Sequence, residues 1–183
     1  ALSIRSMARP LASAKLKGIF GDGFDYEAVR SKRVELMDNY VEKNGIEVKS
    51  GAKELLSFLK ENGYKVALAT ATPPQRAERY LKAHDLYKYF DVTVSASMVS
   101  VGKPAPDIYL KAAEMLGLSP QNCVALEDSP NGIKSASSAG CVTVMVPDLD
   151  KPSNDIIPLL HGVADGLSDV KRILRELEDC NIQ

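Results

Sequence analysis

The stretch Leu126-Glu127-Asp128-Ser129-Pro130-Asn131-Gly132-Ile133 decides how this chain is read, because it sets two adjacent carboxylates after a hydrophobic run. Residues 124–126 are typical of a buried strand, and a Ser-Pro-Asn-Gly turn and then a helix are expected to follow. Open α/β sheets bind their ligands at the carboxyl ends of parallel strands. Carboxylates at such an edge suit Mg²⁺, which takes one or two of them together with phosphate and water. The sequence therefore predicts phosphate chemistry at this edge.

Composition bounds the class of protein. The chain has 183 residues, of which 45% are hydrophobic and 26% charged, enough for one sizeable core and a small accessory domain. Its formal net charge of -1 offers no basic surplus for nucleic acid or an anionic membrane. No hydrophobic run approaches the roughly 20 residues that cross a bilayer. We therefore expect no nucleic-acid partner and no membrane partner.

Cysteine usage indicates a reducing compartment. Cys123, Cys141 and Cys180 lack metal-ligand spacing and are expected to be free thiols, which favours a cytoplasmic location. A redox role for Cys123 or Cys141 is a weaker alternative, because both fall in predicted buried strands, where burial raises the pKa of a thiol. Residues 3–17 are basic and without acids, which faintly resembles a transit peptide, although a truncated or processed chain is the preferred interpretation.

Two regions differ in pattern. Residues 1–48 are expected to be helical, with Asp25 as the N-cap of a second helix that Asn44-Gly45 ends. Hydrophobic residues give each of these helices an apolar face: Leu11, Ala14, Leu16 and Ile19 in the first, and Val29, Val34, Leu36, Met37, Tyr40 and Val41 in the second.

From residue 49 to 183 helices and strands alternate. Helices are predicted at 52–61, 74–84, 106–116, 131–139 and 170–178, and strands at 65–70, 92–95, 123–126 and 141–146. Such alternation implies right-handed crossovers and a mostly parallel sheet. The predicted fold is therefore a doubly wound α/β core with a small helical domain before it.

Three strand ends carry residues that could do chemistry. Thr70 follows the first strand, where a hydroxyl and the backbone N–H groups of the next helix could bind an anion, although a turn threonine is the commoner case. Lys103 is held between Gly102 and Pro104 and could neutralise phosphate oxygens, whereas most lone lysines are solvated. Glu127-Asp128 forms the third end, and adjacent acids often lie in solvated loops.

Together, in this order, the three ends resemble the haloacid dehalogenase superfamily, in its β-phosphoglucomutase-like branch of phosphatases and mutases. The strings Gly102-Lys103-Pro104-Ala105-Pro106-Asp107 and Glu127-Asp128-Ser129-Pro130-Asn131-Gly132 are quite specific to that group, and the resemblance covers nearly the whole chain. It implies a Rossmann-like core with an inserted helical cap. Residues 1–48 would be part of the cap, and residues 49–183 the core.

The resemblance also implies roles. Thr70, with Ala71 beside it, and Lys103 would bind the transferring phosphate, and Asp128 and Glu127 would hold Mg²⁺, with Asp128 the surer ligand. Glu127 could instead support the metal indirectly. Basic cap residues such as Arg5 and Arg9 could bind a second anionic group of the substrate, although a solvated basic face is the favoured alternative.

One motif of the family has no counterpart here. Its Asp-x-Asp follows a strand near the N-terminus and supplies the nucleophile and the acid/base. Asp148-Leu149-Asp150 has the letters but follows the last predicted core strand, so we expect a loop there, and Asp22 and Asp25 have the wrong spacing. We expect the missing strand at the centre of the sheet, between residues 65–70 and 123–126, and regard the chain as a fragment that begins within the cap.

Two hypotheses follow. The intact parent would be a Mg²⁺-dependent phosphatase, or alternatively a sugar phosphomutase, acting on a small phosphorylated metabolite through an aspartyl-phosphate on an upstream Asp. The 183 residues alone would then be inactive. Alternatively, the chain would be a non-catalytic relative that binds phosphate or a partner. A monomer is expected, with strand exchange between chains as an alternative.

Overall fold

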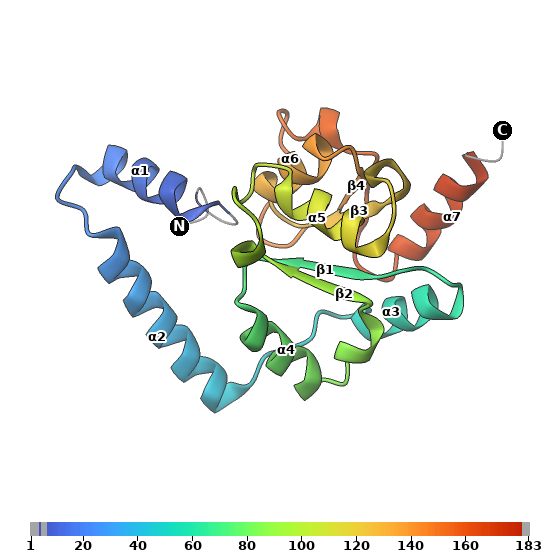
Figure 1. Ribbon diagram of the computed structural model, residues 1–183, viewed down its shortest axis with the longest axis horizontal. Coiled ribbons are helices and arrows are strands. Elements are labelled where there is room, and N and C mark those ends of the chain that lie inside the picture. Colours follow the sequence, from blue (N-terminus) through green and yellow to red (C-terminus); the bar gives the residue numbers. More distant parts are fainter. Residues whose placement is uncertain (1–3, 5–6, 181–183) are drawn as a thin grey trace.

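The structure is a computed structural model that describes residue 4 and residues 7–180. Its helices are α1 (Arg9–Phe20), α2 (Tyr26–Asn44), α3 (Ala52–Glu61), α4 (Pro74–Ala83), α5 (Asp107–Leu116), α6 (Pro130–Ser138) and α7 (Val170–Cys180). Its strands are β1 (Ala67–Thr70), β2 (Val92–Ser95), β3 (Val124–Glu127), β4 (Val142–Met145) and β5 (Gly162–Val163). Helices and strands alternate beyond α3 as predicted, and every strand pair is parallel (Figure 1). The α/β class is confirmed.

Several helix ends follow directly from local sequence. The Asp25 side chain accepts a hydrogen bond from the backbone N–H of Ala28 at 2.9 Å, so the predicted N-cap of α2 is confirmed. Gly45 and Gly117 follow α2 and α5 with φ of 73° and 68°, a conformation that glycine adopts without steric cost. Gly117 thereby ends the helix that follows the Lys103 loop.

The segment after Glu127 differs from its prediction. The Ser-Pro-Asn-Gly turn is the cap and first turn of α6, because the Ser129 hydroxyl accepts a hydrogen bond from the backbone N–H of Gly132 at 3.2 Å. Proline is well suited to this first turn, since it lacks the N–H that a helix start leaves unpaired. The two-residue strand β5 was not predicted, because its hydrophobic pattern is too short to detect.

The strands form two sheets. One has the order β1-β2, and the other has the order β3-β4-β5. Among the described strands, β1 and β3 each pair on one side alone, so each is an edge strand. The division falls between residues 65–70 and 123–126, where the sequence predicted a further central strand.

One hydrophobic core joins the two sheets. Val94 of β2, Ile108 of α5 and Ala125 of β3 belong to the same buried cluster, and Ala69 of β1 packs against it. Burying a side chain the size of Ile108 contributes about 1.5–3 kcal/mol. Helix α5 therefore fixes the β1-β2 sheet beside β3 without a backbone hydrogen bond between the sheets.

The other face of the second sheet is covered by α3 and α7. Leu55 of α3 and Leu174 of α7 are buried with Val144 of β4 in a second cluster. The Tyr64 hydroxyl, just before β1, contacts the Glu178 carboxylate of α7. Helix α7 is thus bound to the segment that leads into the first sheet.

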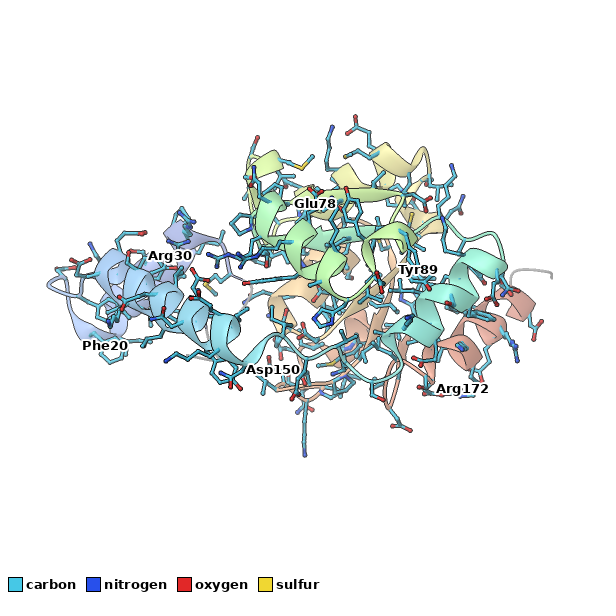
Figure 2. The ribbon with its side chains drawn as sticks, turned by 90° about the horizontal axis from the view of Figure 1, so that it is seen from below. Phe20, Arg30, Glu78, Tyr89, Asp150 and Arg172 are labelled. Atoms are coloured by element: carbon cyan, nitrogen blue, oxygen red, sulfur yellow. The ribbon has the colours of Figure 1, made fainter. Side chains whose placement is uncertain are left out.

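Helices α1 and α2 stand at one end of the molecule. Figure 2 shows them, with Phe20 and Arg30, at the end opposite Arg172. The apolar faces predicted for them are largely uncovered, since Leu11, Ile19, Leu36 and Tyr40 are exposed and no residue of α2 is buried. Within the described part of the chain, no helix combines the length and the apolar character needed to cross a membrane.

The two described cysteine side chains test the redox alternative. Cys141 is buried and Cys123 half-buried, just before the paired strands β4 and β3. Burial, followed by the charge of Cys123, raises the pKa of Cys141 to about 11, and burial also raises that of Cys123. These directions agree with the predicted low reactivity of both thiols.

We expect Cys141 in the folded chain to react with iodoacetamide at pH 8 about 100-fold more slowly than in the urea-unfolded chain, because burial lowers both thiolate content and access. Cys123 should be slowed less. Peptide-resolved mass spectrometry measures both rates. Equal rates for Cys141 in the folded and unfolded chain would contradict the assignment.

Candidate active site

The Lys103 loop is held from three sides. The Asp107 carboxylate accepts a hydrogen bond from the backbone N–H of Val101 at 3.2 Å, which closes the loop at the start of α5. The Ser135 hydroxyl of α6 donates to the Ala105 carbonyl at 2.6 Å. The backbone N–H of Ala8, just before α1, donates to the Lys103 carbonyl at 2.9 Å. The lysine backbone is therefore fixed to its own helix, to α6 and to the start of α1.

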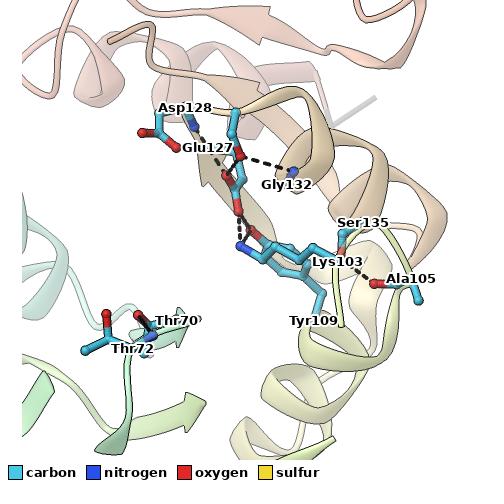
Figure 3. A network of polar contacts seen from close by, with 10 residues as sticks. Thr70, Thr72, Lys103, Ala105, Tyr109, Glu127, Asp128, Gly132 and Ser135 are labelled. Atoms are coloured by element: carbon cyan, nitrogen blue, oxygen red, sulfur yellow. Dashed lines mark hydrogen bonds and ion pairs between the residues drawn. The ribbon is translucent and has the colours of Figure 1, made fainter. Parts of the chain in front are cut away.

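The Lys103 side chain lies against the end of β3. Its ammonium contacts Glu127 Oε1, and the two side chains are 10% and 7% exposed. The Tyr109 hydroxyl of α5 donates to the same oxygen, and Lys103 Nζ lies 3.4 Å from that hydroxyl (Figure 3). This lysine is not solvated, so the common alternative for a lone lysine does not apply here.

Glu127 is enclosed by its own strand end and by α6. Its second oxygen, Oε2, accepts hydrogen bonds from the backbone N–H of Asp128 at 3.3 Å and from the Ser129 hydroxyl at 3.4 Å. A Cβ on Gly132 would collide with the Glu127 carboxylate. The Glu127 carboxylate therefore occupies the space that a side chain at position 132 would fill, which favours glycine in the first turn of α6.

Thr70 lies at the carboxyl end of β1, in the other sheet. Its hydroxyl accepts a hydrogen bond from the backbone N–H of Thr72 at 3.0 Å, and Ala71 between them is exposed. In Figure 3 both threonines lie apart from the Lys103 and Glu127 network. Thr70 therefore makes a contact within its own turn, which is the usual role of a threonine after a strand. It lies at the carboxyl end of β1, where the sequence predicted an anion site.

The predicted metal ligands are Asp128 and Glu127. Asp128 directly follows β3, so its carboxylate belongs to the carboxyl edge of the sheet. Within the described residues no group of three or more His, Cys, Asp or Glu side chains gathers where it could hold a metal ion. One carboxylate still fits Mg²⁺, which keeps several waters and binds substrate phosphate. The contacts of Glu127 with Lys103 and Tyr109 favour indirect support over direct ligation.

Of the two basic residues predicted to bind the substrate, the structure describes Arg9. Arg9 is exposed and is the first residue of that helix, directly after Ala8, which bonds to Lys103. Arg5 lies outside the described residues. Asp148-Leu149-Asp150 is a bend after β4, as expected for a loop.

Sequence reasoning missed Tyr109 and Ser135. Each lies on the helix that follows one motif and contacts the other motif: Tyr109 of α5 donates to Glu127, and Ser135 of α6 donates to the Ala105 carbonyl. The position of Tyr109 could have indicated its contact, because it is the third residue of α5 and lies six positions after Lys103. A polar aromatic residue there can reach the strand end that the lysine faces.

Comparison with known proteins establishes the family. A family model described as haloacid dehalogenase-like hydrolase matches residues 12–140. The chain therefore belongs to the haloacid dehalogenase-like hydrolase family, as its motifs indicated.

Two curated relatives that the chain resembles are named as phosphatases. A phosphorylated carbohydrates phosphatase of Thermotoga maritima is 40% identical over 124 residues, 68% of this chain and 50% of that protein. Hexitol phosphatase B of Escherichia coli is 40% identical over 97 residues, 53% of this chain and 44% of its own length. The chain thus spans about half the length of these curated relatives.

Solved structures share the fold. A β-phosphoglucomutase of Clostridium difficile has a TM-score of 0.75 and 23% identity, covering 99% of this chain and 82% of its own. A HAD phosphatase of Thermococcus onnurineus has a TM-score of 0.66 and 25% identity, covering 88% and 69%. The predicted Rossmann-like architecture is confirmed by these neighbours.

Substituting Gly132→Ala should lower the free energy of unfolding by about 1–3 kcal/mol, although alanine is the better helix former. The Glu127 carboxylate can make room for the new methyl group by breaking its contacts with Lys103 and Tyr109. Urea unfolding measures the change.

The matched control is Gly18→Ala in α1, where an added Cβ meets nothing within 4 Å. That change should be neutral or stabilising by up to about 1 kcal/mol. A Gly132→Ala variant at least as stable as the wild type would show that the carboxylate is not held as described.

Proposed function

We propose that the whole protein containing this chain is a phosphatase that hydrolyses a small phosphorylated metabolite, with a sugar phosphate as the substrate class. The observation that carries the proposal is the buried contact between Lys103 and Glu127 at the carboxyl end of β3. The names of the 40%-identical relatives, which refer to phosphorylated carbohydrates and hexitols, support the substrate class.

Each motif residue receives a role in this proposal. The Lys103 ammonium would bind the phosphoryl oxygens from one side, and the Thr70 hydroxyl and the backbone N–H of Ala71 would bind them from the other. Cationic and N–H donors at fixed positions stabilise charge on a transferring phosphoryl group. Glu127 would hold Lys103 in place.

Asp128 would hold Mg²⁺, whose charge would offset that of the phosphoryl oxygens when it is bound. A carboxylate directly after β3 suits this ion chemically. In this proposal Glu127 acts through Lys103 and through the backbone N–H of Asp128, with which it bonds.

The nucleophile would come from a further strand seated between β1 and β3. Each of these two strands has one edge that pairs with no other described strand. A hollow of about 540 Å³ lies beside Tyr64, ahead of β1, and Val124, at the start of β3. An Asp at the end of that strand would attack phosphorus and displace the alcohol, and water would then hydrolyse the aspartyl-phosphate.

Residues 1–48 would belong to a cap over the site, and residues 49–183 to the core. The bond between Ala8 and the Lys103 carbonyl supports a cap that meets the site here. Arg9, and Arg5 with it, would bind a second anionic group of the substrate. We further propose a cytoplasmic, monomeric protein.

Two other activities use the same residues. In a phosphomutase a second sugar hydroxyl, rather than water, would accept the phosphoryl group. A non-catalytic relative would bind phosphate or a partner with these residues and would not turn a substrate over. Turnover of substrate by the whole protein would distinguish a phosphatase or a phosphomutase from a non-catalytic binder. The released product would distinguish hydrolysis by a phosphatase from transfer by a phosphomutase.

Lys103→Gln should lower kcat/KM of the whole protein for a hexose phosphate by about 10²–10³-fold, the usual cost of losing one donor to developing charge. Glutamine retains a donor for Glu127, so the fold is expected to persist. Phosphate release in the presence of Mg²⁺ is the measurement.

Lys134→Gln serves as the control, because the Lys134 ammonium makes a surface ion pair with Asp155 at 2.9 Å. Its kcat/KM should equal that of the wild type. Full activity of Lys103→Gln would refute the role of the lysine.

A further inference from the structure

Tyr109 contacts both Lys103 and Glu127 but has no role in either motif. It is the third residue of α5 and is 8% exposed. Its hydroxyl donates to Glu127 Oε1, and its ring centroid lies 5.0 Å from Lys103 Nζ. One side chain thus touches both the anion and the cation of the pair.

The hydroxyl competes with the ammonium for one oxygen. Lys103 Nζ and Tyr109 Oη both bond to Glu127 Oε1. A tyrosine hydroxyl is protonated at neutral pH, so Tyr109 donates a hydrogen bond to this oxygen. Part of the carboxylate's hydrogen-bonding capacity is therefore used by tyrosine rather than by lysine.

The ring acts on the lysine in a second way. An ammonium within about 6 Å of an aromatic face is attracted to it, so the ring draws Lys103 Nζ to its own side of the pair. The hydroxyl, 3.4 Å from Nζ, can also accept a hydrogen bond from it. Both contacts of Tyr109 with Lys103 weaken the direct ion pair between Lys103 and Glu127.

We propose that Tyr109 is a positioning residue, which shares Glu127 with Lys103 and thereby leaves the lysine ammonium available for phosphoryl oxygens. The inference rests on the proposed function in assigning phosphate to Lys103. It predicts that loss of the hydroxyl weakens anion binding although the tyrosine itself touches no anion.

The test is titration of the purified whole protein with inorganic phosphate in metal-free buffer, followed by NMR. Tyr109→Phe keeps the ring and removes the hydroxyl, and it should weaken phosphate binding about 3–10-fold, the equivalent of one hydrogen bond. Tyr89→Phe is the matched control, because its hydroxyl bonds to Ser57 at 3.0 Å on another part of the molecule. That variant should bind phosphate like the wild type.

A second variant distinguishes positioning from packing. Glu127→Gln in the Tyr109→Phe background removes the charge that would hold the lysine, so phosphate affinity should recover to within about twofold of Glu127→Gln alone. A merely structural tyrosine would lower the melting temperature without changing the dissociation constant of phosphate.

The outcomes separate the two claims. Equal dissociation constants for the wild type and Tyr109→Phe, or no recovery in the double variant, overturn the role of Tyr109 and leave that of Lys103 intact. If the whole wild-type protein binds no phosphate, or binds it unchanged after Lys103→Gln, the proposed function and the role of Tyr109 both fall.

Discussion

The ion pair between Lys103 and Glu127 is the constraint around which the site is built. Both side chains are nearly buried, and removing one partner of such a pair costs about 3–5 kcal/mol because the other charge stays uncompensated. Hydrogen bonds from the hydroxyls of Tyr109 and Ser129 stabilise the Glu127 carboxylate, and Gly132 leaves room for it. The ion pair therefore constrains which residues fit on β3, α5 and α6.

The ion pair joins the two separate sheets of the fold. Lys103 follows β2, in one sheet, whereas Glu127 ends β3, in the other. Their contact and the shared core under α5 hold the two sheets together where no backbone hydrogen bonds join β1 and β3 (Figure 1). Among the described strands, the same arrangement leaves one edge of β1 and one edge of β3 unpaired.

Local rules account for what could be predicted. The caps at Asp25, Gly45 and Gly117 are set by nearby residues, and the strand ends at Thr70 and Glu127 by short hydrophobic runs. Contacts between distant segments could not be read in this way. The hydrogen bond between Ala8 and Lys103, and the Tyr109 contact, depend on how helices dock on the core. The exposed faces of α1 and α2 differ from expectation for the same reason, since periodicity shows an apolar face but not its partner.

The central claim is that Thr70 and Lys103, from opposite sides of the divided sheet, bind one phosphoryl group. A crystal structure of the chain soaked with tungstate, a heavy analogue of phosphate, tests it most directly. The account predicts a tungstate with oxygens within about 3.2 Å of both Thr70 Oγ1 and Lys103 Nζ. Tungstate bound elsewhere, or bound by one of these groups without the other, would contradict it.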